Sequence, residues 1–222
     1  MNIVTIGLGT FGASLAKALT AAGHDVLGVD ISNEKVEFFK DVIANTICID
    51  ACDPHALKHL PVNEADVFVV CIGHDFGVSV KIAALLKKFG VKKVICRESS
   101  SIHMTVLNSL GVNYTINPEY DSALELAQRI VLPGILGILS ISESLKIIEL
   151  AVPQSLVQTK FEPDVFKQNT RLKILSLKRE GKVLYSASQP LELFVDLYFQ
   201  REDVIVMLGE INIIKKFLKN NE

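Results

Sequence analysis

The segment IVTIGLGTFG, residues 3–12, decides the fold that we expect for this chain of 222 residues. Residues 2–6 are mostly apolar and β-branched and carry no charge, which predicts a short buried strand. Residues 11–22 have apolar side chains at helical spacing, which predicts a helix directly after the strand. The glycines between these two elements therefore lie in the turn that joins a strand to a helix.

Gly7, Gly9 and Gly12 form a Gly-x-Gly-x-x-Gly pattern, which in this context is typical of a site that binds a pyrophosphate. Gly7 permits the tight turn, Gly9 lets the backbone approach the anion, and Gly12 lets the helix pack closely on the strand. The amino end of the helix offers free N–H groups and the positive end of the helix dipole. The alternative is a tight turn between a strand and a helix that holds no ligand.

Asp30 ends a second predicted strand, residues 25–29, and lies about 20 residues after the glycines, as in dinucleotide-binding folds. A carboxylate at this position accepts hydrogen bonds from both ribose hydroxyls, and it repels a 2′-phosphate. We therefore expect NAD, ATP or ADP rather than NADP. The alternative is that Asp30 caps the next helix, residues 32–40, although Ser32 and Asn33 can cap that helix themselves.

Asp50 follows a third predicted strand, residues 45–49, at the edge of the sheet where an adenine would lie. Its carboxylate could accept a hydrogen bond from the amino group of the adenine. The alternative is a turn-forming aspartate before a short helix, residues 54–59. The sequence favours neither role over the other.

Strands and helices continue to alternate up to residue 116. Further strands are predicted at residues 66–72, 93–96 and 113–116, and further helices at residues 79–89 and 102–110. This alternation predicts an α/β fold with a doubly wound, parallel, Rossmann-like sheet. His74 and His103 have no partner at the spacing of a catalytic set.

Residues 122–139 have the pattern of a long helix with apolar residues on most of its faces. A helix that is apolar all round must be buried on several sides. We expect another subunit to cover it, and we expect a kink at Pro133 and Gly134. The alternative is an interior helix of a larger monomer, although too little chain remains to cover it.

From residue 144 onward the pattern predicts a small α+β domain. Its strands are predicted at residues 145–152, 172–177, 182–185 and 203–208, with a final helix at residues 210–219. The predicted organisation is a nucleotide-binding domain at residues 1–118, a crossover and dimerisation helix at residues 119–143, and a regulatory domain at residues 144–222.

The composition limits the classes of function that fit the chain. The net charge is −2 and there is no long basic run, so we expect no nucleic-acid partner. The apolar run at residues 130–141 is shorter than the ~18 residues of a membrane-spanning helix. Met1 leads directly into the first strand, which predicts no signal peptide. The four cysteines lack metal-binding spacing, which indicates reduced thiols in a cytoplasmic protein.

Several fragments in a fixed order resemble the RCK (regulator of conductance of potassium) family, in particular the short TrkA/KtrA-type regulators of bacterial potassium uptake. The fragments of the first half are residues 6–12, Gly23-His24-Asp25-Val26, Val29-Asp30 and Asn117-Pro118-Glu119. Those of the second half are residues 172–177, Pro190, Asp203 and Gly209. The resemblance covers nearly the whole chain. It implies an RCK N-terminal domain, a crossover helix and an RCK C-terminal domain.

The resemblance also implies a ligand, an adenine nucleotide such as NAD, ADP or ATP. The residues it implies are Gly7, Gly9, Thr10, Phe11 and Gly12 for the phosphates, Asp30 for the ribose, Asp50, Ala51 and Cys52 for the adenine, and Ile72, Gly73 and His74 to close the site. Glu119 corresponds to an acidic residue that can help to hold a divalent cation. Thr10 stands where the KtrA-type pattern has an arginine for the terminal phosphate, which favours NAD, ADP or AMP over ATP.

The resemblance implies a regulator and not an enzyme. The expected protein is a cytoplasmic subunit, peripheral to the inner face of the cell membrane, that gates a potassium channel or transporter. Its homo-oligomer would be a ring built from dimers. One alternative is a small NAD-dependent oxidoreductase, with Lys81, His74 and Tyr120 as loose candidates for a proton donor. Another alternative is a nucleotide sensor whose partner is not a channel.

Overall fold

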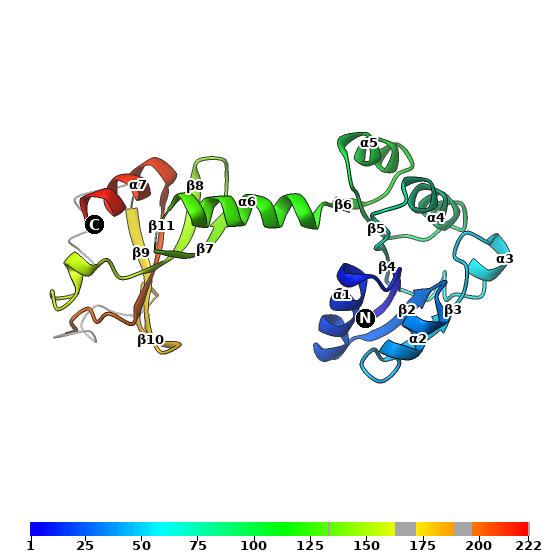
Figure 1. The fold of residues 1–222 in the computed structure, drawn as a ribbon, viewed down its shortest axis with the longest axis horizontal. Helices are drawn as coiled ribbons and strands as arrows, with labels where there is room; N and C mark the ends of the chain where they lie inside the picture. The colour runs from blue at the N-terminus through cyan, green and yellow to red at the C-terminus, as the bar shows by residue number, and fades with distance from the viewer. Residues whose placement is uncertain (133, 163–171, 189–196, 222) are drawn as a thin grey trace. The chain divides into compact units, whose positions relative to one another are not determined.

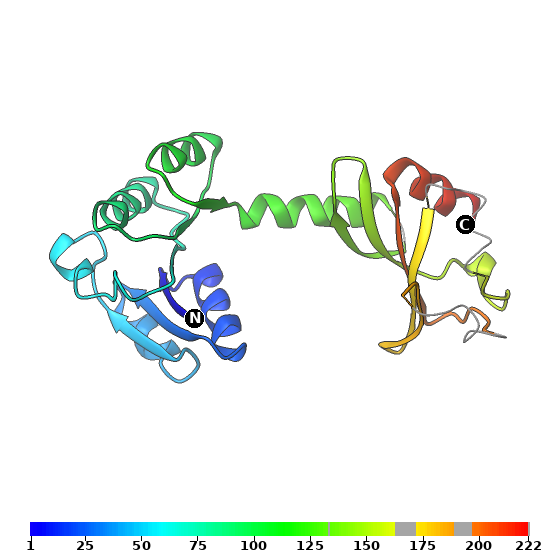
Figure 2. The same ribbon diagram turned by 180° about the vertical axis from the view of Figure 1, so that it is seen from behind.

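A computed structural model describes residues 1–132, 134–162, 172–188 and 197–221 of the chain. The chain divides into two compact units, Met1–Tyr120 and Asp121–Glu222. Figures 1 and 2 show the ribbon of each unit from two opposite sides. Pro133, at the predicted kink, and Pro190, in the resemblance, lie outside the described residues.

The first unit contains a parallel sheet of six strands in the order β3-β2-β1-β4-β5-β6 (Figure 1). The strands are β1 (Asn2–Ile6), β2 (Asp25–Asp30), β3 (Asn45–Cys48), β4 (Val67–Val70), β5 (Val94–Arg97) and β6 (Tyr114–Ile116). The helices between them are α1 (Thr10–Ala21), α2 (Asn33–Phe39), α3 (Pro54–Leu57), α4 (Phe76–Lys88) and α5 (Ser101–Ser109). The order reverses between β1 and β4, so the predicted doubly wound sheet is confirmed.

Each face of this sheet has its own apolar core, because successive side chains of a strand point to opposite faces. On one face, Val4 of β1 belongs to a cluster that includes Leu86 of α4 and Leu107 of α5. On the other face, Ile3 of β1 belongs to a cluster that includes Ala16 of α1. Burial on both faces explains why the central strand β4, with the sequence VFVV, is apolar throughout.

The second unit contains an antiparallel sheet of five strands in the order β10-β9-β11-β8-β7. The strands are β7 (Ile135–Ser140), β8 (Leu145–Ala151), β9 (Leu172–Arg179), β10 (Lys182–Ser186) and β11 (Asp203–Glu210). The other elements are α6 (Pro118–Val131), which begins in the first unit, a 3-10 turn η1 (Gln154–Leu156) and α7 (Ile211–Asn220). Ile205 and Met207 of β11 pack in one cluster with Ile214 of α7, as the predicted small α+β fold requires.

The prediction of one long helix at residues 122–139 is wrong after Val131. α6 ends there, and Gly134 follows with a φ of +82°, which a helix cannot continue. Residues 135–140 form β7, in which Ile138 pairs with Ile148 of β8. In the strand, Ile135 is buried in the core of the second unit, whereas Leu136 and Leu139 stay exposed.

Candidate functional site

The turn between β1 and α1 depends on its glycines. Gly7 has a φ of +97°, in the left-handed region that favours glycine, and its N–H donates to the carbonyl of Val29 at 2.7 Å. A Cβ atom at Gly12 would lie 1.9 Å from the carbonyl oxygen of Gly7, so only glycine lets α1 pack this closely. These two positions therefore set the shape of the turn.

The amino end of α1 has no side-chain cap. Gly9 is its N-cap residue, and no acidic residue lies in the first turn. The next four helices, α2 to α5, each have an N-cap side chain that accepts from the backbone, and these caps are Ser32, Asp53, Asp75 and Ser100. A Cβ atom added at Gly9 would meet no atom within 4 Å. The amino end of α1 therefore combines N–H groups without a side-chain cap with open space beside Gly9, which suits an anion.

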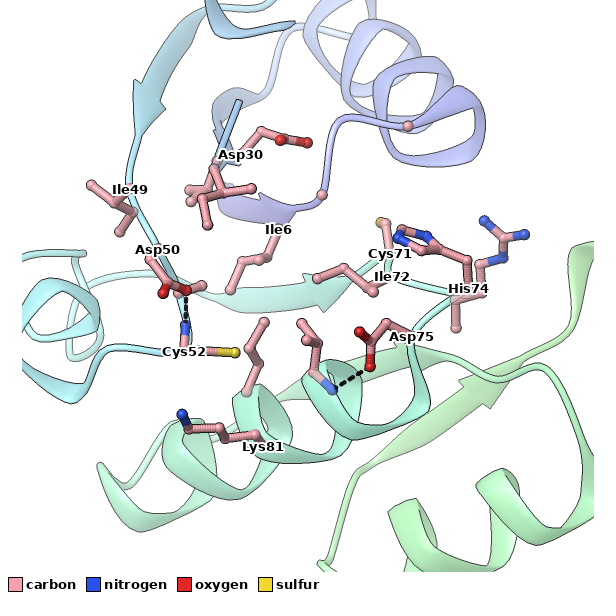
Figure 3. Close-up of a pocket in the computed structure, with 18 of the residues that line it drawn as sticks. Ile6, Asp30, Ile49, Asp50, Cys52, Cys71, Ile72, His74, Asp75 and Lys81 are labelled. Carbon is pink, nitrogen blue, oxygen red and sulfur yellow. Dashed lines mark hydrogen bonds between the residues drawn. The ribbon is translucent and has the colours of Figure 1, made fainter. Parts of the chain in front are cut away.

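A cavity of about 650 Å³ opens next to this helix end, at the carboxyl ends of β1, β2, β3 and β4. Figure 3 shows Asp30 and Ile6 on one side of it and Lys81 of α4 on the other. Open α/β sheets bind ligands at this edge, where the strand order reverses. Eight residues implied for the nucleotide line the cavity, namely Gly7, Gly9, Asp30, Asp50, Ala51, Cys52, Ile72 and His74.

Asp30 lies buried in the wall of the cavity, with 7% of its surface exposed. Its Oδ2 atom accepts from the backbone N–H of Leu8 at 2.7 Å and from Lys35 Nζ at 3.3 Å, and Oδ1 accepts from the N–H of Ser32 at 2.9 Å. Ser32 itself caps α2, so the helix does not need Asp30 as its cap. A carboxylate has about four acceptor sites, which leaves capacity for a ribose hydroxyl.

Asp50, Ala51 and Cys52, predicted to flank an adenine, all line the cavity. Figure 3 shows Asp50 and Cys52 next to each other. Asp50 Oδ1 accepts from the backbone N–H of Cys52 at 2.8 Å, and Asp53 caps α3. Asp50 thus makes the turn and also lines the cavity, and the two readings of this residue are compatible. Burial, and to a smaller extent the charge of Asp50, raises the pKa of the Cys52 thiol, which therefore stays protonated at neutral pH.

Thr10, Phe11, Gly12 and Gly73 belong to the implied set but not to the lining of the cavity. Thr10 is exposed in the first turn of α1, and the ring of Phe11 lies 5.8 Å from the guanidinium carbon of Arg97. Gly73 also borders Arg97, since a Cβ atom at Gly73 would lie 2.6 Å from Arg97 Nε. Phe11 and Gly73 therefore border Arg97, a residue for which the sequence predicted no role.

Arg97 lines the cavity and forms an ion pair with Glu119. It ends β5, so its side chain leaves the sheet at the same edge as the ligand site. The sequence offers one signal for Arg97, which is a charged residue at the end of an otherwise apolar strand. Its partner Glu119, however, follows 22 residues later in the chain. Lys35 and Asp75 also line the cavity and were missed.

The divalent cation at Glu119 stays a prediction. Within residues 1–132, 134–162, 172–188 and 197–221, no group of three histidine, cysteine or acidic side chains could hold a metal ion. The carboxylate of Glu119 forms an ion pair with Arg97. In the same part of the chain, none of the helices combines the length and the apolar character needed to cross a bilayer.

Residues 3–118 match the TrkA-N domain family. The Ktr system potassium uptake protein C of Bacillus subtilis (strain 168) is 29% identical over 219 residues, which cover 98% of this chain and 96% of that protein. The Ktr system potassium uptake protein A of the same organism is 28% identical over 220 residues, with coverages of 97% and 95%. Both relatives are therefore similar to this chain along almost their whole length.

Solved structures with a similar fold include two of GsuK. The GsuK RCK domain has a TM-score of 0.66 at 15% identity. The match covers 47% of the GsuK chain and 98% of this chain. The GsuK channel bound to NAD has a TM-score of 0.65 at 16% identity, with coverages of 37% and 95%. This chain thus spans less than half of either GsuK chain, and the likeness concerns the fold. The resemblance drawn from the sequence is confirmed, and the chain belongs to the TrkA-N domain family.

Proposed function

We propose that this chain is the nucleotide-binding regulatory subunit of a membrane potassium uptake system of the Ktr or Trk type. The observation that carries the proposal is the uncapped amino end of α1, which faces a cavity with the buried carboxylate of Asp30 in its wall. The two Ktr relatives, similar over nearly their full length, support the choice of system. Its partner would be the membrane channel or transporter of that system, so the subunit would lie on the inner face of the cell membrane.

The proposed ligand is an adenine nucleotide, NAD, ADP or ATP, and the shape of the site fits it. The space beside Gly9 could hold a pyrophosphate against the N–H groups of α1. Asp30 would accept from the ribose, and residues 50–52 would flank the adenine. Ile72 and His74 would close the site from the end of β4.

Regulation by such a ligand requires several sites that act together. A ligand moves a gate only if it binds the two states unequally. Changing a population from 1:99 to 99:1 needs about 5.5 kcal/mol, whereas one coupled site typically supplies about 1–3 kcal/mol. A homo-oligomeric ring built from dimers would supply the difference. Exposed apolar side chains on α6, such as Leu126 and Ile130, offer a surface for the second copy.

A substitution at Gly9 tests the nucleotide site. Gly9→Asp should give α1 the cap that it lacks, because the φ of −74° and ψ of −174° suit an N-cap residue. The protein should become slightly more stable, by about a few tenths of a kcal/mol. Its carboxylate would occupy the anion site, so affinity for NAD and ADP should fall about tenfold or more. Thermal unfolding and isothermal titration calorimetry measure the two effects.

Gly9→Ser is the matched control, because serine caps a helix equally well but adds no charge. It should gain the same stability and lose less affinity than Gly9→Asp. If the folded Gly9→Asp protein binds adenine nucleotides as tightly as the parent, the ligand does not lie on α1 and the proposal fails. Mass spectrometry of the denatured protein would identify any nucleotide that the parent retains through purification.

A further inference from the structure

Arg97 is a partly buried cation at the rim of the cavity, next to the proposed phosphate site. Its side chain is 21% exposed, and its guanidinium lies between Gly73 and the ring of Phe11, which belongs to the first turn of α1. Gly73 leaves this space open, since a Cβ atom there would come within 2.7 Å of the guanidinium carbon. The local fold thus makes room for the arginine beside the amino end of α1.

The hydrogen-bonding capacity of Arg97 is largely unused. A guanidinium has five N–H donors in a planar fork. Among the described residues, only Nη2 has a partner, the carboxylate of Glu119, while Nε is buried and has none. A buried donor without a partner is uncommon and costs free energy, so the pairing with Glu119 leaves the guanidinium only partly satisfied. The fork of an arginine matches a phosphate in shape and charge.

We propose that Arg97 reads the second phosphate of the bound nucleotide and that Glu119 competes with that phosphate for the guanidinium. The inference rests on the proposed function, because it assumes that a nucleotide binds at Gly7 and Gly9. Arg97, at the end of β5, would supply the charge that Thr10 of α1 lacks. The site would thereby distinguish a nucleoside diphosphate or a dinucleotide from a monophosphate.

The exchange releases the start of α6. Glu119 is the second residue of that helix, and its carboxylate, 63% exposed, pairs with Arg97. Asn117 Oδ1 accepts from the N–H of Tyr120, so the helix keeps a cap when Glu119 is released. A glutamate in the first turn also interacts favourably with the helix dipole. The ligand thus changes the attachment of α6 without unfolding its first turn.

Calorimetric titrations of the full chain with AMP and with ADP test this inference, with EDTA present so that no divalent cation bridges the groups. Arg97→Gln should weaken ADP binding about tenfold or more and leave AMP binding nearly unchanged. Glu119→Gln should strengthen ADP binding about two- to fivefold, because the competing pair is exposed and weak. The double variant should behave like Arg97→Gln, because Glu119 competes only for Arg97.

The pair formed by Arg129 and Glu125 on α6 provides matched controls, since it is an arginine–glutamate pair of the same helix outside the cavity lining. Arg129→Gln and Glu125→Gln should leave the ratio of ADP to AMP affinity unchanged. An unchanged ratio in Arg97→Gln, or weaker ADP binding in Glu119→Gln, overturns the inference. If Arg97→Gln fails to fold, the exposed Glu119→Gln variant decides alone. A parent protein that binds neither nucleotide overturns the proposed function instead.

Discussion

His103 of α5 shows how a single buried residue makes the first unit sensitive to acid. It has no exposed surface, its ring lies 4.9 Å from that of Phe76, and Nδ1 accepts from the N–H of Ser99 at 3.3 Å. Burial lowers the pKa of His103 below 6.5, and the nearby carboxylate of Glu98 opposes this only in part. The folded protein therefore holds the imidazole neutral at a pH where the unfolded chain begins to take up a proton.

The sign of the resulting pH dependence follows from that lowered pKa. The stability that His103 contributes is complete above pH 6.5 and is lost as the pH falls through the lower pKa of the folded state. We expect the free energy of unfolding to fall less steeply between pH 7 and about pH 5 in His103→Asn, whose amide oxygen can still accept from Ser99. Urea titrations at several pH values measure this slope. His59→Asn, at an exposed site, should keep the slope of the parent.

The junction of α6 and β7 shows why one element was predicted wrongly. An apolar run fits a buried helix and a buried strand equally well, and its periodicity alone does not separate them. Gly134, with its positive φ, and the pairing of β7 with β8 decide in favour of the strand. Both depend on contacts that the local pattern does not contain.

Alanine substitutions at two glycines of this junction distinguish the cost of backbone strain from the cost of a steric clash. Gly134→Ala should destabilise the protein by about 1–2 kcal/mol, because the left-handed conformation is costly for alanine. At Gly137, in β7, a Cβ atom would meet the side chain of Glu149 at an ordinary 3.7 Å, and φ is not positive. Gly137→Ala should be neutral or stabilising by up to about 1 kcal/mol. Denaturant titrations compare the two, and equal losses would contradict this account of the junction.

The first unit was predictable where a local pattern has one structural solution. The glycine turn and the strand ending in Asp30 have this property, because their residue types permit little else. The pairing of Arg97 with Glu119 was not predictable, because it depends on β6. That strand pairs with β5, with Arg97 opposite Ile116, and so brings Glu119 back to the ligand edge. Local patterns therefore predict the elements, but not the side chains that the sheet brings together.

Several apolar side chains of α6 are exposed to solvent in the single chain. Leu124, Leu126, Ile130 and Val131 are each at least 44% exposed. Exposed apolar patches of this kind mark surfaces for association. A second copy of the chain would cover them, as the proposed ring requires.

Small-angle scattering of the purified full chain tests assembly and regulation together. We expect a particle larger than one chain, whose profile differs between NAD, ADP and ATP. The reason is that ligands shift a ring only through unequal affinity for its states. Gly9→Asp should assemble like the parent but respond only at about tenfold higher nucleotide concentrations or more. Identical profiles with every nucleotide would argue against gating by this site.

The uncapped amino end of α1 also bears on how long the protein survives in a cell. An anion that completes this helix end binds the folded chain only, and at 100 times its dissociation constant it adds about 2.7 kcal/mol to the free energy of unfolding. The empty subunit is correspondingly easier for a protease to open and degrade. Nucleotide supply would then set not only the state of the regulator but also its abundance.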